Sequence, residues 1–120
     1  MNGLVDLKGR ALLTVLVGSS ADQAETPVEV WVDTAFTGEL VLPRATIQSL
    51  GLEPSLVIDA VLGDGQLAEM DTFVGWINWF GEVKEIEVVA SEKQTPLLDV
   101  MLMLNHRLEV DYRTLTLTLE

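Results

Sequence analysis

The chain has 120 residues, 48% of them apolar, and a formal net charge of −12. This length fits a single domain over residues 1–120, and the apolar fraction excludes a disordered chain. An acidic surface repels phosphate backbones and anionic lipid, so we expect no nucleic-acid and no membrane partner. The chain has no cysteine and one histidine, His106, so we expect no disulfide, no metal site and no cysteine nucleophile. Any chemistry is expected to depend on carboxylates, without a cofactor.

Residues 1–21 contain a short apolar stretch, Ala11–Val17, after two basic residues. This is the order of a signal peptide, but Asp6 lies in the region that should be basic and Thr14 interrupts the apolar part. The β-branched and aliphatic residues of the stretch are equally typical of a strand. No apolar run reaches the roughly 18 residues that a membrane helix needs, and we therefore expect a cytoplasmic protein.

The first half of the chain is predicted to continue with two strands and a helix. Valines alternate with other residues over 28–32, and this period of two predicts a half-buried strand. Small and polar residues over 33–38 end it, and residues 39–42 predict a further short strand. Pro43 suits the first position of a short helix that ends at Gly51.

The second half is predicted to form a long hairpin and further strands. Residues 56–62 have strand character, Gly63-Asp64-Gly65 is a turn signal, and residues 66–80 alternate again. Residues 83–90 predict another strand, and Asp99–Leu104 a second short helix with Asp99 as its N-cap.

Near the carboxyl terminus the apolar residues change from even to odd positions, which requires a turn or bulge near 111–114. His106 follows the second predicted helix and suits a position at its carboxyl end. The pattern as a whole is all-β with two short helices.

Asp33 is the most informative residue for chemistry. It lies at the end of an apolar strand, between Val32 and Phe36, where a carboxylate costs free energy unless it is hydrogen-bonded. A tight turn supplies such bonds from its own N–H groups and from a threonine hydroxyl. The turn therefore holds a carboxylate rigidly among apolar residues, although Asp-Thr-Ala alone is also typical of an ordinary strand-end turn.

The segment Val32-Asp33-Thr34-Ala35-Phe36-Thr37-Gly38-Glu39-Leu40-Val41-Leu42-Pro43 resembles the active-site segment of the retropepsin-like (clan AA) aspartic proteases. The closest resemblance is to the small prokaryotic group whose motif reads Asp-Thr-Gly-Phe. The similarity extends over nearly the whole chain, in four elements that follow the family's order. These are the strand pair 11–17 and 27–32, the helix 44–50, the hairpin 56–73 and the segment Leu97–Leu104.

The resemblance implies an acid-protease-like closed β-barrel with a flap hairpin, acting as a homodimer. It implies an aspartic endopeptidase in which Asp33, Thr34 and Ala35 form the catalytic segment. Because the chain has one such motif, Asp33 of each subunit would supply half of a carboxyl pair around one water. Thr34 would brace the two active-site loops. Gly63, Asp64 and Gly65 would form the flap tip over a peptide or protein substrate.

Two positions depart from the family pattern. Ala35 replaces the usual glycine, and it keeps the backbone N–H that can bind the carboxylate. Asp99 stands where the second structural motif has glycine. It either caps the following helix or adds a carboxylate near the catalytic pair, which would raise the pKa values of that pair. These departures leave an alternative open: a catalytically inactive protease-like domain that serves dimerisation or the binding of extended peptides.

Overall fold

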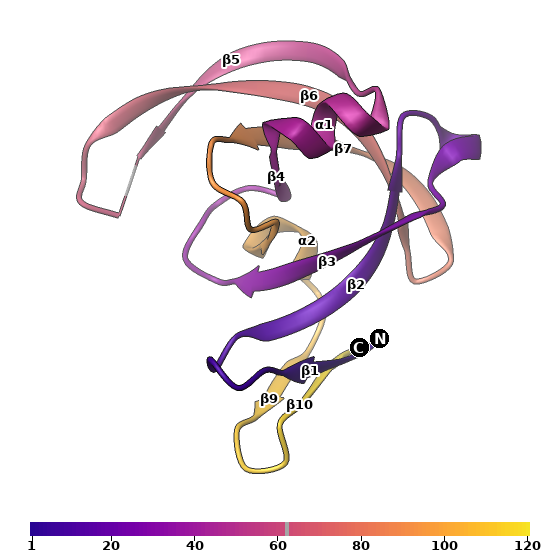
Figure 1. The fold of residues 1–120 in the computed structure, drawn as a ribbon, viewed down its shortest axis with the longest axis vertical. Helices are drawn as coiled ribbons and strands as arrows, with labels where there is room; N and C mark the ends of the chain where they lie inside the picture. The colour runs from indigo at the N-terminus through magenta and orange to yellow at the C-terminus, as the bar shows by residue number, and fades with distance from the viewer. Residues whose placement is uncertain (62) are drawn as a thin grey trace.

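The computed structural model describes residues 1–61 and 63–120 (Figure 1). The strands are β1 (Asn2–Val5), β2 (Ala11–Gly18), β3 (Thr26–Asp33), β4 (Leu40–Pro43), β5 (Glu53–Val61), β6 (Leu67–Trp79), β7 (Glu82–Ser91), β8 (Leu97–Asp99), β9 (Leu108–Asp111) and β10 (Thr116–Leu119). The helices are α1 (Arg44–Leu50), α2 (Val100–Met103) and the 3-10 turn η1 (Ala21–Gln23). No helix within the described ranges has the length and apolar character needed to span a bilayer.

Among the described strands, six close into a barrel. They follow the order β6, β7, β4, β8, β3, β2, and β2 then pairs with β6 through Leu16–Gly18 opposite Trp76–Asn78. The pairs β3–β8 and β4–β7 are parallel. Closure pairs the edges of these strands with one another, which protects them from association with other chains. The predicted all-β closed barrel with two short helices is confirmed.

The barrel encloses the apolar core. In β3, Val28 and Val30 are buried and Glu29 and Trp31 are exposed, as the period-two pattern predicts. Residues from the other barrel strands and both α-helices complete the core, among them Val15, Val17, Leu40, Leu42, Ile47, Ile77, Val88, Leu98 and Leu102.

Helix α1 follows β4 directly and packs on the barrel through Ile47. Gly51 ends the helix with φ 71°, and its N–H donates to the carbonyls of Ile47 and Gln48. We predicted Pro43 at the first helical position, but the helix begins at Arg44 and Pro43 is its N-cap. The difference is one residue, because Pro43 keeps the extended backbone of β4.

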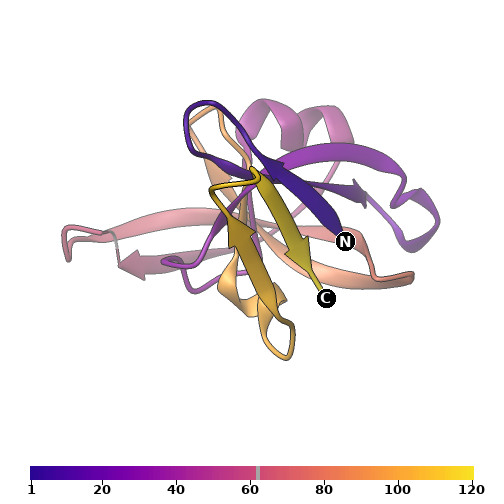
Figure 2. The same ribbon diagram turned by 90° about the horizontal axis from the view of Figure 1, so that it is seen from below.

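The predicted hairpin is formed by β5 and β6, which pair from Glu53 opposite Val74 to Val61 opposite Leu67. Figure 2 shows it extending well beyond the barrel. Gly65 has φ 85°, a conformation that favours glycine. The predicted strand 56–62 ends at Leu62, which lies outside the described residues.

The remaining strands form a small sheet that continues from β2. β1 pairs with β2 and β10, and β10 pairs with β9. The predicted turn near 111–114 lies between β9 and β10, where the Asp111 carboxylate accepts the N–H groups of Arg113 and Thr114. β1 was not predicted. It brings the termini together, and the Met1 ammonium donates to the Leu119 carbonyl at 2.6 Å (Figure 1).

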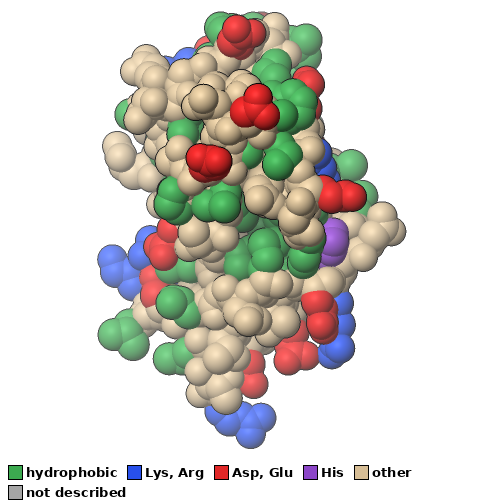
Figure 3. Space-filling model, turned by 90° about the vertical axis from the view of Figure 1, so that its right-hand side faces the viewer, with side chains coloured by type: hydrophobic (Ala, Val, Ile, Leu, Met, Phe, Trp, Pro, Cys, Tyr) green, Lys and Arg blue, Asp and Glu red, His purple; other side chains and the backbone are tan. Residues whose placement is uncertain are grey.

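His106 has contacts that its predicted position at the end of a helix does not explain. Its Nε2 accepts a hydrogen bond from Trp79 Nε1 at 3.2 Å. Its ring also stacks on Phe80, with centroids 4.6 Å apart and planes 6° apart. Figure 3 shows the imidazole beside hydrophobic side chains. Through these contacts His106 connects the end of β6 to the segment after α2.

Candidate active site

Asp33 is the last residue of β3 and is half-buried. Its Oδ1 accepts the N–H of Ala35 at 2.9 Å, which is the tight-turn bond that the sequence predicts. Thr34 and Ala35 follow on the exposed surface of the loop. Because a backbone N–H supplies the bond, alanine at position 35 holds the carboxylate as glycine would.

The loop of residues 34–39 is fastened to β8 and α2 by backbone hydrogen bonds. The N–H of Asp99 donates to the Glu39 carbonyl at 2.9 Å, and that of Met101 donates to the Gly38 carbonyl at 2.9 Å. The N–H of Val100 reaches the Phe36 carbonyl at 3.3 Å. The position of the loop that follows Asp33 is therefore set by the segment that begins at Asp99.

Asp99 lies directly beside Asp33. In the parallel β3–β8 pair, Asp33 is the partner of Asp99, so their side chains emerge at the same level of the sheet. Asp99 is 0% exposed. Burial, and then the charge of Asp33, raise the pKa of Asp99 to about 8.

The predicted capping role of Asp99 is wrong. It stands at the N-cap position of α2, but its side chain makes no capping hydrogen bond in the described structure. Helix α2 covers only Val100–Met103, shorter than the predicted Asp99–Leu104. Both Asp99 carboxyl oxygens are buried without a hydrogen-bond partner among the described residues, so burial in the barrel overrides the local capping preference.

Gly38 makes room for the Asp99 carboxyl. A Cβ added at Gly38 would lie 2.7 Å from Phe36 Cε1 and 3.3 Å from Asp99 Oδ2. The loop backbone therefore passes close over the carboxyl, and a side chain at position 38 would crowd Phe36 and Asp99. Sequence reasoning did not single out Gly38, because the approach joins positions 61 residues apart.

The fold that holds Asp33 and Asp99 is similar to solved structures of protease-like domains. No family model and no curated protein matches the sequence. A structure of EIAV protease complexed with the inhibitor HBY-793 is similar, with 20% identity, coverage of 78% of this chain and 85% of that chain, and a TM-score of 0.52. The retroviral protease-like domain of Ddi1 from Leishmania major has 13% identity, coverage of 91% and 88%, and a TM-score of 0.51.

The chain has a retropepsin-like acid protease fold. At these identities the likeness concerns the fold, so the prokaryotic subgroup with its Asp-Thr-Gly-Phe motif stays a prediction. In this retropepsin-like chain the predicted catalytic residues Asp33, Thr34 and Ala35 form one turn at the end of β3. The predicted tip residues 63–65 are exposed at the far end of the hairpin, away from the barrel (Figures 1 and 2).

A hydroxyl group holds the base of that hairpin. β5 changes register against β6 between Pro54 and Val57. The buried Thr72 bridges this bulge: its Oγ1 accepts the N–H of Leu56 at 3.1 Å and donates to the Leu56 carbonyl at 3.0 Å. Sequence reasoning missed Thr72, and the proline in β5 was the one local signal of an irregular strand.

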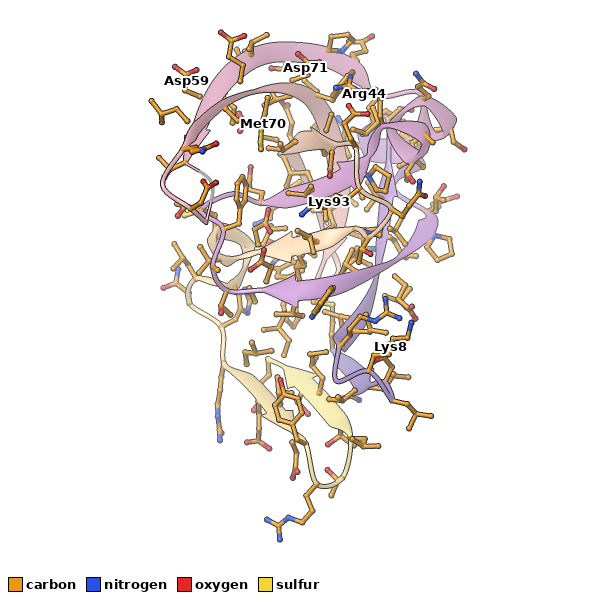
Figure 4. All side chains as sticks on the ribbon, turned by 60° about the vertical axis from the view of Figure 1, so that its left-hand side comes forward. Lys8, Arg44, Asp59, Met70, Asp71 and Lys93 are labelled. Atoms are coloured by element: carbon orange, nitrogen blue, oxygen red, sulfur yellow. The ribbon has the colours of Figure 1, made fainter. Side chains whose placement is uncertain are left out.

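Arg44 connects the same region to α1. Its guanidinium lies 3.1 Å from Asp71 of β6 and 3.0 Å from Glu92, which follows β7. Figure 4 shows Arg44 beside Asp71, with Asp59 and Met70 further along the hairpin. These ion pairs are exposed, so they connect α1 to the hairpin base but contribute little to the stability of the fold. Within residues 1–61 and 63–120, no group of three or more acidic or histidine side chains could hold a metal ion.

Proposed function

We propose that this chain is an aspartic endopeptidase that acts as a homodimer of single retropepsin-like domains. Asp33 of each subunit contributes one carboxyl group to the site. The observation that carries the proposal is the Asp33 carboxylate, held by the Ala35 N–H at the end of β3 in a retropepsin-like fold. One of the similar structures is by name a protease with a bound inhibitor, which supports the same chemistry.

The mechanism follows from two carboxyl groups that face one water. Two carboxylates this close do not both ionise, so the pair shares one proton and titrates as a unit. The ionised carboxylate takes a proton from the water as general base, and the protonated one donates to the carbonyl oxygen of the peptide bond. One Asp-Thr-Ala motif per chain means that the pair is formed across a two-fold axis.

The neighbouring residues have supporting roles in this proposal. Thr34 follows Asp33 on the exposed surface of the loop, where it braces one active-site loop against the other. The hairpin with Gly63, Asp64 and Gly65 at its tip closes over the substrate and excludes water. An extended peptide substrate binds by strand addition, with pockets for alternate side chains.

Cleavage of an unfolded polypeptide tests the proposal. The protein is incubated with a reduced, denatured substrate from pH 3 to 8, in parallel with Asp33→Asn and the matched surface variant Asp22→Asn. We expect cleavage by the wild type and by Asp22→Asn, and a loss of at least about 100-fold in Asp33→Asn, because the variant has no carboxylate to take the proton.

Three outcomes would overturn the proposal. Cleavage that persists in Asp33→Asn would come from a contaminant. A wild-type protein that dimerises and binds extended peptides without cleaving them would be the inactive domain of the alternative interpretation. Sedimentation at the assay concentration must also show a dimer, since a monomer holds one half of the carboxyl pair.

A further inference from the structure

Asp99 is a buried carboxyl group that the proposed reaction does not use. It is 0% exposed, and both of its oxygens are without a hydrogen-bond partner in the described part of the chain. An ionised carboxylate is costly in such a place, whereas the neutral acid is tolerated. The family resemblance assigns no function to a carboxyl here, because glycine is its usual residue.

The titratable group that acts on Asp99 is also acidic. Asp33 is its register partner on β3, and the charge of Asp33 acts on it. Glu39, before β4, accepts the Asp99 N–H with its backbone carbonyl, whereas its carboxylate accepts the N–H of Glu87 on β7 at 2.9 Å. The surroundings therefore favour the neutral form of Asp99, and the pKa of Asp99 is raised to about 8, by burial first and by Asp33 second.

The carboxyl also lies under the loop that carries Asp33. A Cβ at Gly38 would approach Asp99 Oδ2 to 3.3 Å, and three backbone bonds join the loop to residues 99–101. An ionised Asp99 needs water or a hydrogen-bond donor, and a movement of this loop away from its Oδ2 would admit water. Ionisation would also place a second negative charge beside Asp33.

We propose that Asp99 is a positioning residue: as a neutral acid it keeps the loop 34–39 packed on β8 with Asp33 in place, and its ionisation opens that loop. The consequence for catalysis rests on the proposed function. The coupling of Asp99 to Asp33 and to the loop is a property of the folded chain and is measurable without any substrate.

The experiment is a pH titration by NMR of the protein labelled with ¹³C at the aspartate carboxyls and with ¹⁵N. We expect Asp99 to be protonated at pH 6 and to titrate near pH 8, in step with the amide signals of residues 34–39. In Asp33→Asn the Asp99 titration should move down by about one pH unit, because a neighbouring negative charge is gone. Asp22→Asn should leave the titration unchanged.

Asp99→Asn removes the ionisable group at position 99 but keeps the size of the side chain. It is neutral and of the same size, so the loop amides should lose their transition near pH 8 and keep their pH 6 positions up to pH 9. In the cleavage assay, extended to pH 9 for this comparison, its rate should stay within about twofold of wild type below pH 7. The ratio of its rate to that of wild type should rise as the wild-type loop opens near pH 8 and above.

The outcomes are distinct from those of the proposed function. An Asp99 that is ionised at pH 6, an Asp99 titration that is unchanged in Asp33→Asn, or a loop transition that persists in Asp99→Asn would each overturn the proposal. If the NMR results are as expected and the wild type cleaves nothing, Asp99 still positions the loop and the enzymatic function fails instead.

Discussion

Asp33 and Asp99 have the same side chain at adjacent positions of two parallel strands, yet their environments differ in every respect that controls ionisation. Asp33 is half-buried and accepts a backbone N–H. Asp99 is fully buried, and its oxygens find no donor among the described residues. The same pair of strands thus holds one aspartate side chain that is partly accessible and one that is fully buried, and burial favours the neutral form of the second.

The raised pKa of Asp99 predicts that stability depends on pH. Its pKa rises from an ordinary value of 3.8 in the unfolded chain to about 8 in the folded chain. Between these values the folded chain binds more protons, so the free energy of unfolding falls as the pH rises from about 4 to 8 and then levels off. The contribution of Asp99 is on the order of 6 kcal/mol at most. Urea denaturation at pH 5, 7 and 9 measures it.

Asp99→Asn removes this contribution together with its coupling to Asp33, whereas carboxylates far from Asp99 titrate alike in both proteins. We expect the variant to match the wild type at pH 5 and to be more stable at pH 9, whereas the exposed Asp22→Asn should parallel the wild type throughout. A difference between wild type and Asp99→Asn that stays constant from pH 5 to 9 would contradict the prediction.

At the scale of elements, the hairpin depends on the hydroxyl of Thr72. Thr72→Val keeps the shape but leaves the N–H and the carbonyl of Leu56 without their partner. We expect Thr72→Val to lower the free energy of unfolding by about 1–3 kcal/mol. We also expect hydrogen exchange in β5 near the bulge to be faster than in wild type, by more than in the β2–β3 pair. Thr72→Ser retains the hydroxyl and should stay close to wild type. Equal exchange in Thr72→Val and wild type would show that the bulge does not need this bond.

The sequence predicts the elements whose signals are local. Alternation marks β3 and the hairpin strands, and Gly51 marks the end of α1. β1 escaped prediction because it has four residues, of which Val5 alone is buried, and it becomes a strand only when β2 and β10 flank it. The closure of the barrel by β2 and β6 is likewise invisible locally, since these strands lie about 60 residues apart.

The candidate site divides in the same way. The turn at Asp33 and its bond from Ala35 follow from a tripeptide and could be predicted. For Asp99 the sequence offered two interpretations, and the local one, a helix cap, is wrong. An aspartate that caps a helix usually lies at the surface. The parallel β3–β8 register instead places this carboxyl in the interior. No pattern within a few residues of Asp99 reports that neighbour.

For the whole molecule, the barrel leaves two strands at the ends of the described sheet, β5 in the hairpin and β9 beside the termini. Such edges can accept a further strand from another chain. In the proposed enzyme the hairpin edge suits the extended substrate, whereas the two subunits meet at the loops that follow Asp33. The two proposed interactions therefore do not compete for one edge.

Charge opposes the association of two such chains. Each carries a formal −12, and the proposed dimer −24. Protonation of Asp99 makes the charge of each chain one unit less negative than this value at neutral pH. Repulsion between charges is screened beyond the Debye length, about 30 Å at 0.01 M salt and about 8 Å at physiological salt. The dissociation constant of the dimer should therefore report on ionic strength and on pH.

We expect the dimer to tighten on acidification from pH 8 to pH 5 and on addition of salt, in each case by lowering the repulsion between subunits. The effects of acidification and of salt on the dissociation constant should be less than additive, because protonation relieves less repulsion when salt already screens the charges. Sedimentation equilibrium at pH 5 and 8, each at 0.01 M and at 0.15 M salt, gives the four dissociation constants. Asp99→Asn is neutral at both pH values. Its dimer should be tighter than that of the wild type at pH 8, and the difference between the two proteins should be smaller at pH 5. A dissociation constant that is the same in all four conditions would mean that apolar contacts alone set the association, and that the acidity of this chain has no part in it.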